Sequence, residues 1–207
     1  MKKKDALKIK AVIFDLGNVL VNYDAGKAAK RFSVVSGLST REIWKRFFLS
    51  GFEQAYTRGE ISTREFHRVA CKTLGVSIPL ATFSHYWTDI FRKSPGMDKL
   101  LTRIKKHYPL YVISNTNALH FTYIRKKFRI LRHFKRVFPS HKVGARKPGL
   151  KIYQRVLRKI GLRPEETVFI DDMKSFIAGA SKAGMHVIHF RGLARLKRDL
   201  KRLGIRF

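Results

Sequence analysis

Residues 11–18 read Ala-Val-Ile-Phe-Asp-Leu-Gly-Asn. A continuous apolar run followed at once by an acid, a glycine and an asparagine is typical of a buried parallel strand and its exit turn. Further apolar runs occur at 110–113, 168–170 and 187–188. Because amphipathic helical patterns lie between the later runs, the sequence predicts an α/β fold, a parallel sheet with helices on both faces.

Residues 22–95 interrupt this alternation with helical signals alone. The capping-box sequence Ser-Thr-Arg-Glu occurs at 39–42 and again at 62–65, each time before an apolar helical pattern. Pro79 opens another amphipathic helix that continues to Phe91. With no convincing strand here, we expect a small inserted α-helical cap. The expected boundaries are 1–21 and 96–207 for the core and 22–95 for the cap.

The charge of the chain is unusual. Its 207 residues include 45 Lys and Arg against 14 Asp and Glu, a formal net charge of +31. This balance predicts attraction to phosphates, nucleic acid or anionic surfaces, and it says nothing about the fold.

Two features bear on the cellular compartment. The single Cys71 cannot form an intramolecular disulfide, which suits a reducing cytoplasm. The start Met1-Lys2-Lys3-Lys4 imitates a signal peptide, but Asp15 and Gly17 interrupt the apolar run that follows. No apolar stretch approaches the roughly 18 residues of a membrane span. We therefore expect a cytoplasmic protein with no membrane span.

Acidic residues are scarce, yet Asp15 and the pair Asp171-Asp172 directly follow apolar runs. The carboxyl ends of parallel strands meet at one edge of a sheet, so these side chains should converge. Clustered carboxylates need a cation among them, and hard oxygen ligands suit Mg²⁺. A single Asp in such a place could simply cap the next helix, but three at two strand ends favour a metal site.

Two further polar groups are expected at the same edge. Ser114-Asn115 follows the run 110–113, and Lys147-Pro148 precedes a helical pattern. A hydroxyl, backbone N–H groups and an ammonium there could hold an anionic oxygen. Each signal is weak alone, since the chain has 45 basic residues and turns often contain Ser and Asn. Their order along the chain, together with the acids, makes the pattern specific.

In that order, the sequence resembles the haloacid dehalogenase-like hydrolase superfamily. The four motifs of the superfamily appear as FDLGNVL at 14–20, VISN at 112–115, RKP at 146–148 and FIDD at 169–172. The resemblance spans essentially the whole chain. It looks closest to the subgroup of the bacterial α-D-glucose-1-phosphate phosphatase and the N-terminal phosphatase domain of soluble epoxide hydrolase, and it implies a Rossmann-like core with a helical cap.

The resemblance also implies a Mg²⁺-dependent phosphomonoesterase that acts through an aspartyl phosphate, with Asp15 as the nucleophile. The implied metal ligands are Asp15, the backbone carbonyl of Gly17, and Asp171 or Asp172. The implied groups that bind and stabilise the phosphate are Ser114, the Asn115 backbone and Lys147. The expected partner is a small phosphorylated metabolite, no cofactor besides Mg²⁺ is indicated, and the chain is expected to be a monomer.

One departure from the superfamily concerns position 17. Most of its phosphatases carry an acid two residues after the nucleophile, where this chain has Gly17. General acid–base help is worth about 10² to 10⁴ in rate, so another group supplies it or the leaving group departs readily. An anomeric oxygen departs readily, which favours a small sugar phosphate such as a sugar 1-phosphate. Glu60 could substitute for the acid, although a plain surface Glu is the simpler interpretation.

A second departure is that Met173 and Phe176 stand where relatives usually carry polar residues that brace the metal site. Losses of this kind weaken metal binding or activity by about 10- to 100-fold. A degenerate, inactive relative is the extreme case. The retained Asp15, Lys147 and Asp171-Asp172 argue against it.

Two other functions are compatible with parts of the sequence. A dehalogenase would also use an Asp nucleophile, but that branch lacks the adjacent acidic pair. Nucleic-acid binding is the alternative from another class, because residues 124–138 interleave basic side chains with Phe128, Phe134 and Phe138. The simpler interpretation of that segment is that its aromatic rings face the core and its basic groups face water. Non-specific binding to polyanions is expected from charge alone.

Overall fold

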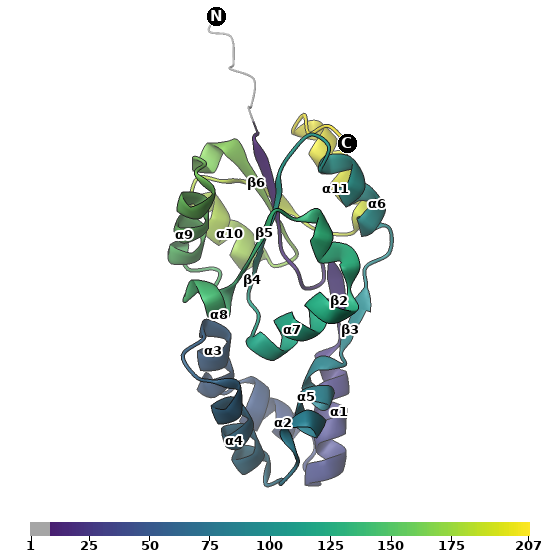
Figure 1. The fold of residues 1–207 in the computed structure, drawn as a ribbon, viewed down its shortest axis with the longest axis vertical. Helices are drawn as coiled ribbons and strands as arrows, with labels where there is room; N and C mark the ends of the chain where they lie inside the picture. Colours follow the sequence, from purple (N-terminus) through teal and green to yellow (C-terminus); the bar gives the residue numbers. More distant parts are fainter. Residues whose placement is uncertain (1–8) are drawn as a thin grey trace, which may run out of the picture.

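The computed structural model describes residues 9–207 and has a five-stranded parallel sheet at its centre (Figure 1). The strand order is β5-β4-β1-β6-β7. The strands are β1 (Ala11–Phe14), β4 (Leu110–Ser114), β5 (Arg136–Pro139), β6 (Thr167–Asp171) and β7 (His186–His189). Residues 1–8, the start of the predicted core with its Met1–Lys4 segment, lie outside the described residues. The central place of β1 sets Asp15 between the ends of β4 and β6.

The predicted strands are confirmed, and the sequence analysis missed β5. This strand lies at the edge of the sheet and pairs only with β4. It begins with the exposed Arg136, and only its last two residues are buried. An edge strand of this kind lacks the continuous apolar run that marks a buried one.

Helices cover both faces of the sheet, as predicted. Val12 and Phe14 of β1 pack on one face, and Ala11 and Ile13 pack on the other. The first face is covered by α6 (Met97–Ile104), α7 (Ala118–Lys127) and α11 (Leu193–Arg202). The second face is covered by α8 (Ser140–Val143), α9 (Leu150–Ile160) and α10 (Lys174–Lys182). Short 3₁₀ turns are η2 (Arg129–His133) and η3 (Pro164–Glu166).

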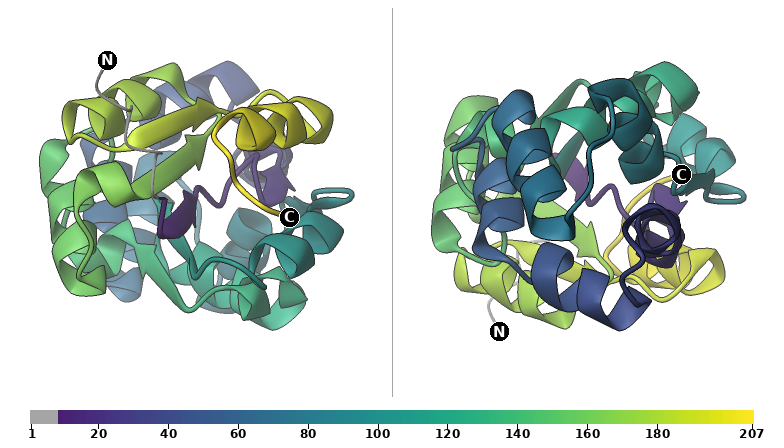
Figure 2. Two further views of the ribbon diagram at one scale, coloured as in Figure 1. Left: turned by 90° about the horizontal axis from the view of Figure 1, so that it is seen from above. Right: turned by 90° about the horizontal axis from the view of Figure 1, so that it is seen from below.

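The cap helices form the lower lobe in Figure 1 and lie in front in the right-hand view of Figure 2. They are α1 (Ala25–Ser36), α2 (Thr40–Ile43), the π-helical turn η1 (Trp44–Phe48), α3 (Gly51–Arg58), α4 (Thr63–Leu74) and α5 (Leu80–Thr88). They enclose an aromatic core around Phe32, Phe47 and Phe83. Ser39 and Glu42 form the full reciprocal capping box. At the second predicted box only Ser62 takes part, because the Glu65 carboxylate binds Arg68.

Two short strands connect the cap helices to the sheet, β2 (Val21–Tyr23) and β3 (Phe91–Lys93). They pair antiparallel, with Tyr23 opposite Phe91. The expectation of no strand between 22 and 95 was therefore wrong at both ends. The helix opened by Pro79 ends at Thr88, which leaves Phe91 in β3. Strands this short show no alternation, and their pairing depends on contact between distant parts of the chain.

Candidate active site

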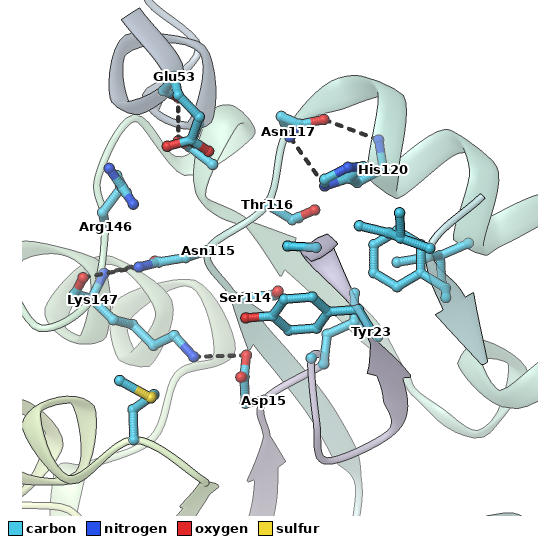
Figure 3. A pocket seen from close by; sticks show the side chains of 18 of the residues that line it. Asp15, Tyr23, Glu53, Ser114, Asn115, Thr116, Asn117, His120, Arg146 and Lys147 are labelled. Carbon is cyan, nitrogen blue, oxygen red and sulfur yellow. Dashed lines mark hydrogen bonds and ion pairs between the residues drawn. The ribbon is translucent and has the colours of Figure 1, made fainter. Parts of the chain in front are cut away.

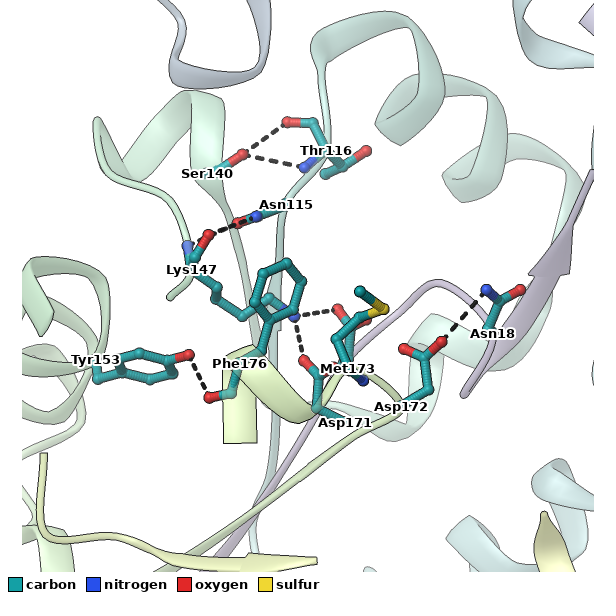
Figure 4. Close-up of polar contacts among 11 residues, drawn as sticks. Asn18, Asn115, Thr116, Ser140, Lys147, Tyr153, Asp171, Asp172, Met173 and Phe176 are labelled. Carbon is teal, nitrogen blue, oxygen red and sulfur yellow. Dashed lines mark hydrogen bonds and ion pairs between the residues drawn. The ribbon is translucent and has the colours of Figure 1, made fainter. Parts of the chain in front are cut away.

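The three predicted acidic side chains meet at the carboxyl edge of the sheet. Asp15 follows β1 (Figure 3), and Asp171 ends β6 with Asp172 beside it (Figure 4). Each offers an oxygen, and these oxygens lie within 4.8 Å of one another. Asp15 and Asp171 are buried and Asp172 is half-buried. Parallel pairing of β1 with β6 is what brings them together.

Lys147 is buried between two of these carboxylates. Its Nζ lies 2.7 Å from Asp15 Oδ1 and 2.5 Å from Asp171 Oδ2. Asp15 Oδ1 nevertheless accepts no well-aligned hydrogen bond within the described part of the chain. Burial raises the pKa of the Asp15 carboxyl, the Lys147 ammonium opposes this effect, and Asp171 adds to it. The ammonium therefore offsets the cost of burying two carboxylates side by side.

The Asn115 side chain holds the backbone of Lys147 in place. Its Oδ1 accepts a hydrogen bond from Lys147 N, and its Nδ2 donates one to Lys147 O, both at 2.9 Å. On the other side, a Cβ on Gly179 of α10 would overlap the carbonyl of Pro148, so the close approach of α10 requires glycine. With the side chain of Asn115 engaged in this way, the backbone N–H is the expected donor from this residue to an anionic oxygen. Ser114, at the end of β4, also lines the pocket described below.

The two adjacent acids differ in their surroundings (Figure 4). Asp171 uses both oxygens, because Oδ1 accepts from Met173 N at 2.8 Å and Oδ2 accepts from Lys147 Nζ. Asp172 is more open, and its Oδ2 receives a long 3.4 Å hydrogen bond from Asn18 Nδ2. Burial, and then the neighbouring Asp171, raise the pKa of Asp172. The sequence analysis did not distinguish Asp171 from Asp172 as the metal ligand, whereas their different surroundings in the structure do.

Met173 and Phe176 both face the site. Met173 is 49% exposed at the pocket, and the Phe176 ring centroid lies 4.8 Å from Lys147 Nζ. The Phe176 backbone carbonyl accepts a hydrogen bond from Tyr153 Oη at 2.7 Å, which fixes the start of α10. An apolar side chain and a cation–π contact therefore occupy the places where the resemblance leads one to expect polar braces.

A cavity of about 350 Å³ opens between this edge of the sheet and the cap helices (Figure 3). Its floor contains Asp15, Gly17, Ser114, Asn115, Lys147 and Asp172. Its cap side is largely aromatic, with Trp44, Phe48, Trp87 and Phe91. The rings of Trp44 and Phe48, which share the π-helical turn η1, lie 4.4 Å apart. Of the predicted site residues, only Asp171 lies behind the cavity wall, covered by Lys147.

Gly17 lies beneath the ring of Tyr23. A Cβ at position 17 would stand 3.0 Å from Tyr23 Cε1. The phenol of Tyr23 points into the pocket, toward the part where Asp15 and Ser114 lie (Figure 3). Tyr23 as a whole is 45% exposed, and the partial burial of its phenol, followed by the carboxylates of Asp172 and Asp15, raises the pKa of that phenol. The sequence analysis missed Tyr23, because nothing local shows that β2 folds back over Gly17.

The cap carboxylate in the pocket is Glu53, whereas Glu60 lies outside it. Glu60 is exposed and bound by Arg58, with N–O distances of 2.5 and 2.8 Å, as the simpler interpretation expected. Glu53 of α3 stands near Arg146 at the pocket wall (Figure 3). Burial raises the pKa of Glu53, and the positive charge of Arg146 opposes this. The sequence analysis missed Glu53, because α3 had no signal that told its pocket side from its outer side.

His120 joins α7 of the core to the cap helices. Its Nε2 lies 2.9 Å from the Trp87 carbonyl oxygen, and its ring stacks on the Trp87 indole at 4.8 Å. Burial lowers the pKa of His120 to about 4. The imidazole is therefore neutral at physiological pH and acts as a hydrogen-bonding link.

The basic segment 124–138 has its aromatic rings turned inward. Phe128 and Phe138 are buried, and Phe134 packs edge-on against Phe14 with ring centroids 5.9 Å apart. Basic residues such as Arg129 and Arg132 are exposed. The simpler interpretation of this segment is confirmed, and its aromatic rings offer no stacking surface for bases.

Comparisons with known proteins agree with this geometry. A family model described as haloacid dehalogenase-like hydrolase matches residues 12–190. The chain is 23% identical to a D-ribitol-5-phosphate phosphatase of Bacteroides thetaiotaomicron, over 93% of this chain and 97% of that protein. It is 29% identical to mouse acyl-CoA dehydrogenase family member 10 over 86% of its own length, but it spans only 18% of that protein. A crystal structure of a HAD family enzyme from Bacteroides thetaiotaomicron, in complex with magnesium and inorganic phosphate, superposes with a TM-score of 0.81 at 25% identity, covering 89% of this chain and 95% of that one.

Proposed function

Because this chain belongs to the haloacid dehalogenase-like hydrolase family, we propose that it is a Mg²⁺-dependent phosphatase that uses Asp15 as the nucleophile on a small phosphorylated metabolite. The observation that carries the proposal is the floor of the pocket. There a buried carboxylate, Asp15, lies against the buried ammonium of Lys147 beside the more open Asp172. A phosphatase that matches this chain over 97% of its own length supports the reaction class.

The donors at this floor fit a magnesium ion. Carboxylate oxygens of Asp15, Asp171 and Asp172 gather within 4.8 Å, and hard oxygen donors are what Mg²⁺ prefers. Within the described residues Asp15 has one side-chain partner, Lys147 Nζ at 2.7 Å from Oδ1, while both oxygens of Asp171 are engaged. We therefore assign Asp15, Asp172 and the Gly17 carbonyl as ligands, with Asp171 orienting Lys147. When bound, magnesium neutralises charge on the phosphate and on the Asp15 carboxylate.

The residues of the chain then account for a two-step transfer. An Asp15 carboxylate oxygen attacks phosphorus, the bond from phosphorus to the leaving oxygen breaks, and that oxygen takes a proton from the solvent. Water next attacks phosphorus and loses a proton to the solvent, and the bond from phosphorus to the Asp15 oxygen breaks, which releases inorganic phosphate and restores the Asp15 carboxylate. Lys147, Ser114 and the Asn115 N–H stabilise the phosphoryl oxygens through both steps. The cap helices limit the access of bulk water.

The substrate that we propose is a small sugar or polyol phosphate, with a sugar 1-phosphate as the specific candidate. A 350 Å³ cavity has room for such a leaving group. Its aromatic wall suits the C–H faces of a sugar, and Glu53 and Arg146 can bind hydroxyls. The absence of an acid at Gly17 favours a leaving group that departs readily. The relative named for ribitol 5-phosphate supports the wider class of phosphorylated polyols.

Phosphate release from a panel of sugar 1-phosphates, sugar 5- and 6-phosphates and aryl phosphates tests this function. We expect release that requires Mg²⁺ and disappears in Asp15→Asn, because the nucleophile is then lost. Asp199→Asn, on α11 outside the pocket, is the matched control and should keep full activity. Independently of turnover, Mg²⁺ should raise the thermal midpoint of the unmodified chain but not that of Asp172→Asn. Release that persists in Asp15→Asn, or without Mg²⁺, contradicts the proposal.

A further inference from the structure

Tyr23 occupies the space that an acidic side chain at position 17 would need. A Cβ on Gly17 would stand 3.0 Å from the Cε1 of Tyr23 and 3.3 Å from its Cδ1, so any larger residue at position 17 requires the ring to shift. The ring carries its own polar group to this point, since its hydroxyl projects into the pocket (Figure 3). The phenol of Tyr23 therefore stands where the side chain that Gly17 lacks would lie.

Contacts of its ring and of its backbone hold Tyr23 there. It pairs with Phe91 across the β2–β3 ribbon, with ring centroids 6.1 Å apart. Its backbone N–H donates to Asn18 Oδ1 at 3.4 Å. Asn18 adopts a left-handed conformation with φ 53°, and its Nδ2 reaches Asp172. The ring thus packs on Phe91, while the backbone of Tyr23 is linked through Asn18 to Asp172.

Other polar groups of the pocket are less suited to act on a leaving group. Lys147 is held between Asp15 and Asp171. The imidazole nitrogens of His120 are used by Trp87 O and Asn117 Nδ2. Glu53 lies on the cap side, near Arg146 and away from Asp15 (Figure 3). In contrast, the Tyr23 hydroxyl points toward the region above Asp15, and Figure 3 draws no hydrogen bond to it.

We propose that the Tyr23 hydroxyl donates a hydrogen bond to the leaving-group oxygen of the phosphate ester, in the place of the acid that Gly17 lacks. An in-line attack by Asp15 puts that oxygen on the far side of phosphorus, toward the cap, where a side chain from the linker strand β2 can reach it. The hydrogen bond stabilises charge that develops on the oxygen as its bond to phosphorus breaks. A phenol has an ordinary pKa of about 10, so the donor is present at neutral pH. This inference rests on the proposed phosphatase function.

The kinetic test compares two leaving groups in Tyr23→Phe, which keeps the ring over Gly17. Butyl phosphate has a poor leaving group that needs the donor, and p-nitrophenyl phosphate has a good one that needs it far less. We expect the ratio of kcat/KM for butyl to p-nitrophenyl phosphate to fall at least about tenfold, because removing one donor to a developing charge costs roughly 10²-fold or more. Tyr86→Phe, which removes a phenol hydroxyl outside the pocket, is the control and should leave the ratio unchanged.

A binding measurement gives a readout that does not depend on turnover. In the Asp15→Asn background, phenyl phosphate and benzylphosphonate differ only in the bridging oxygen or methylene, and are compared at a pH where both are dianions. Tyr23→Phe should raise the Kd of phenyl phosphate about 3- to 10-fold and leave the Kd of benzylphosphonate unchanged, since the methylene accepts no hydrogen bond. Equal weakening of both, or of neither, overturns the inference.

The two proposals fail in different ways. If the unmodified chain hydrolyses neither ester, the phosphatase function fails and this inference fails with it. If the unmodified chain turns over both esters and Tyr23→Phe slows them equally, Tyr23 is only structural and the phosphatase function stands.

Discussion

Gly17 and Tyr23 are in contact at the floor of the pocket, and the size of one side chain limits the place of the other. Glycine fits under the ring as it stands, whereas a Cβ there would lie 3.0 Å from Tyr23 Cε1 and would push the ring aside. The ring in turn packs against Phe91, and the backbone N–H of Tyr23 donates to Asn18 in the loop after Asp15. A change at one of the two positions should therefore have its effect through the other.

Gly17→Asp is expected to give no gain on alkyl phosphates by itself, because the new side chain must displace Tyr23. Tyr23→Ala alone should lower the rate of phosphate release from these esters about 10²-fold, since the donor and the packing are both removed. In the double variant Gly17→Asp/Tyr23→Ala, the carboxyl has room, and we expect at least about a tenfold recovery over Tyr23→Ala. Phosphate release from butyl phosphate measures all three, with circular dichroism as the folding control. A gain in Gly17→Asp alone equal to that of the double variant would contradict the shared-space account.

The cap helices are attached to the core at two places, through α3 on α8 and α5 on α7. At the first, the buried Ser140 Oγ lies 2.6 Å from the Thr57 carbonyl oxygen. At the second, His120 Nε2 lies 2.9 Å from the Trp87 carbonyl oxygen. A hydrogen bond from the Leu119 N–H of α7 to Tyr56 Oη of α3, at 3.2 Å, links these two places. These hydrogen bonds fix the distance between the cap helices and the sheet, and so the depth of the pocket.

Gly59→Ala should loosen the first attachment. Gly59 has a φ of +77°, and a Cβ there would overlap the backbone carbonyl of His141 on α8. Gly37→Ala is the matched control, since its φ is +71° and nothing lies within 4 Å of an added Cβ. Both variants pay the left-handed strain of about 1 kcal/mol, but Gly59→Ala should lose a further 1–3 kcal/mol of unfolding free energy, roughly the cost of overpacking. Urea unfolding measures the difference, and equal losses in the two variants would refute a close α3–α8 contact.

His120 should make the second attachment sensitive to acid. Burial lowers its pKa to about 4 in the folded chain from an ordinary 6.5, so between these values the unfolded chain binds a proton that the folded chain does not. The free energy of unfolding should therefore fall as pH drops from 6.5 to 4, by up to about 3 kcal/mol from this residue. His120→Phe keeps a ring against Trp87 and should flatten the decline in urea unfolding over this window. The exposed His107→Phe serves as control, and an unchanged slope in His120→Phe would assign the acid sensitivity elsewhere.

At the scale of the whole molecule, charge dominates. The net charge is +31, and the basic residues of segment 124–138 are exposed while its phenylalanines are buried. None of the helices within residues 9–207 is long and apolar enough to span a bilayer. A strongly positive surface around an anionic substrate raises the rate of encounter, and the same field attracts competing polyanions.

Added salt should therefore lower kcat/KM for phosphate esters, mainly through a higher KM, because screening shortens the range of attraction to about 10 Å at 0.1 M salt. We expect about a tenfold decrease from low to high salt and inhibition by heparin at low salt. Sucrose at equal osmolarity is the uncharged control. A kcat/KM that is indifferent to salt would show that the net charge plays no part in substrate capture.

Much of this architecture is present in the sequence itself. The continuous apolar runs that become β1, β4 and β6 are local patterns, and the acids, the hydroxyl and the ammonium of the site stand directly at their ends or before α9. Parallel pairing then makes their meeting at one edge a geometric consequence. The positions of Asp15, Ser114, Lys147 and Asp171-Asp172 could therefore be predicted, because each depends on a neighbouring run.

Only the tertiary structure decided the rest. The strand β5 at the sheet edge and the short strands β2 and β3 owe their existence to partners distant in the chain. The placement of Tyr23 over Gly17, of Glu53 in the pocket, and of Asp171 behind Lys147 likewise depends on distances between segments. Local patterns in a sequence encode burial and chain direction, whereas a contact between segments exists only once the sheet has paired and the cap helices have packed against it.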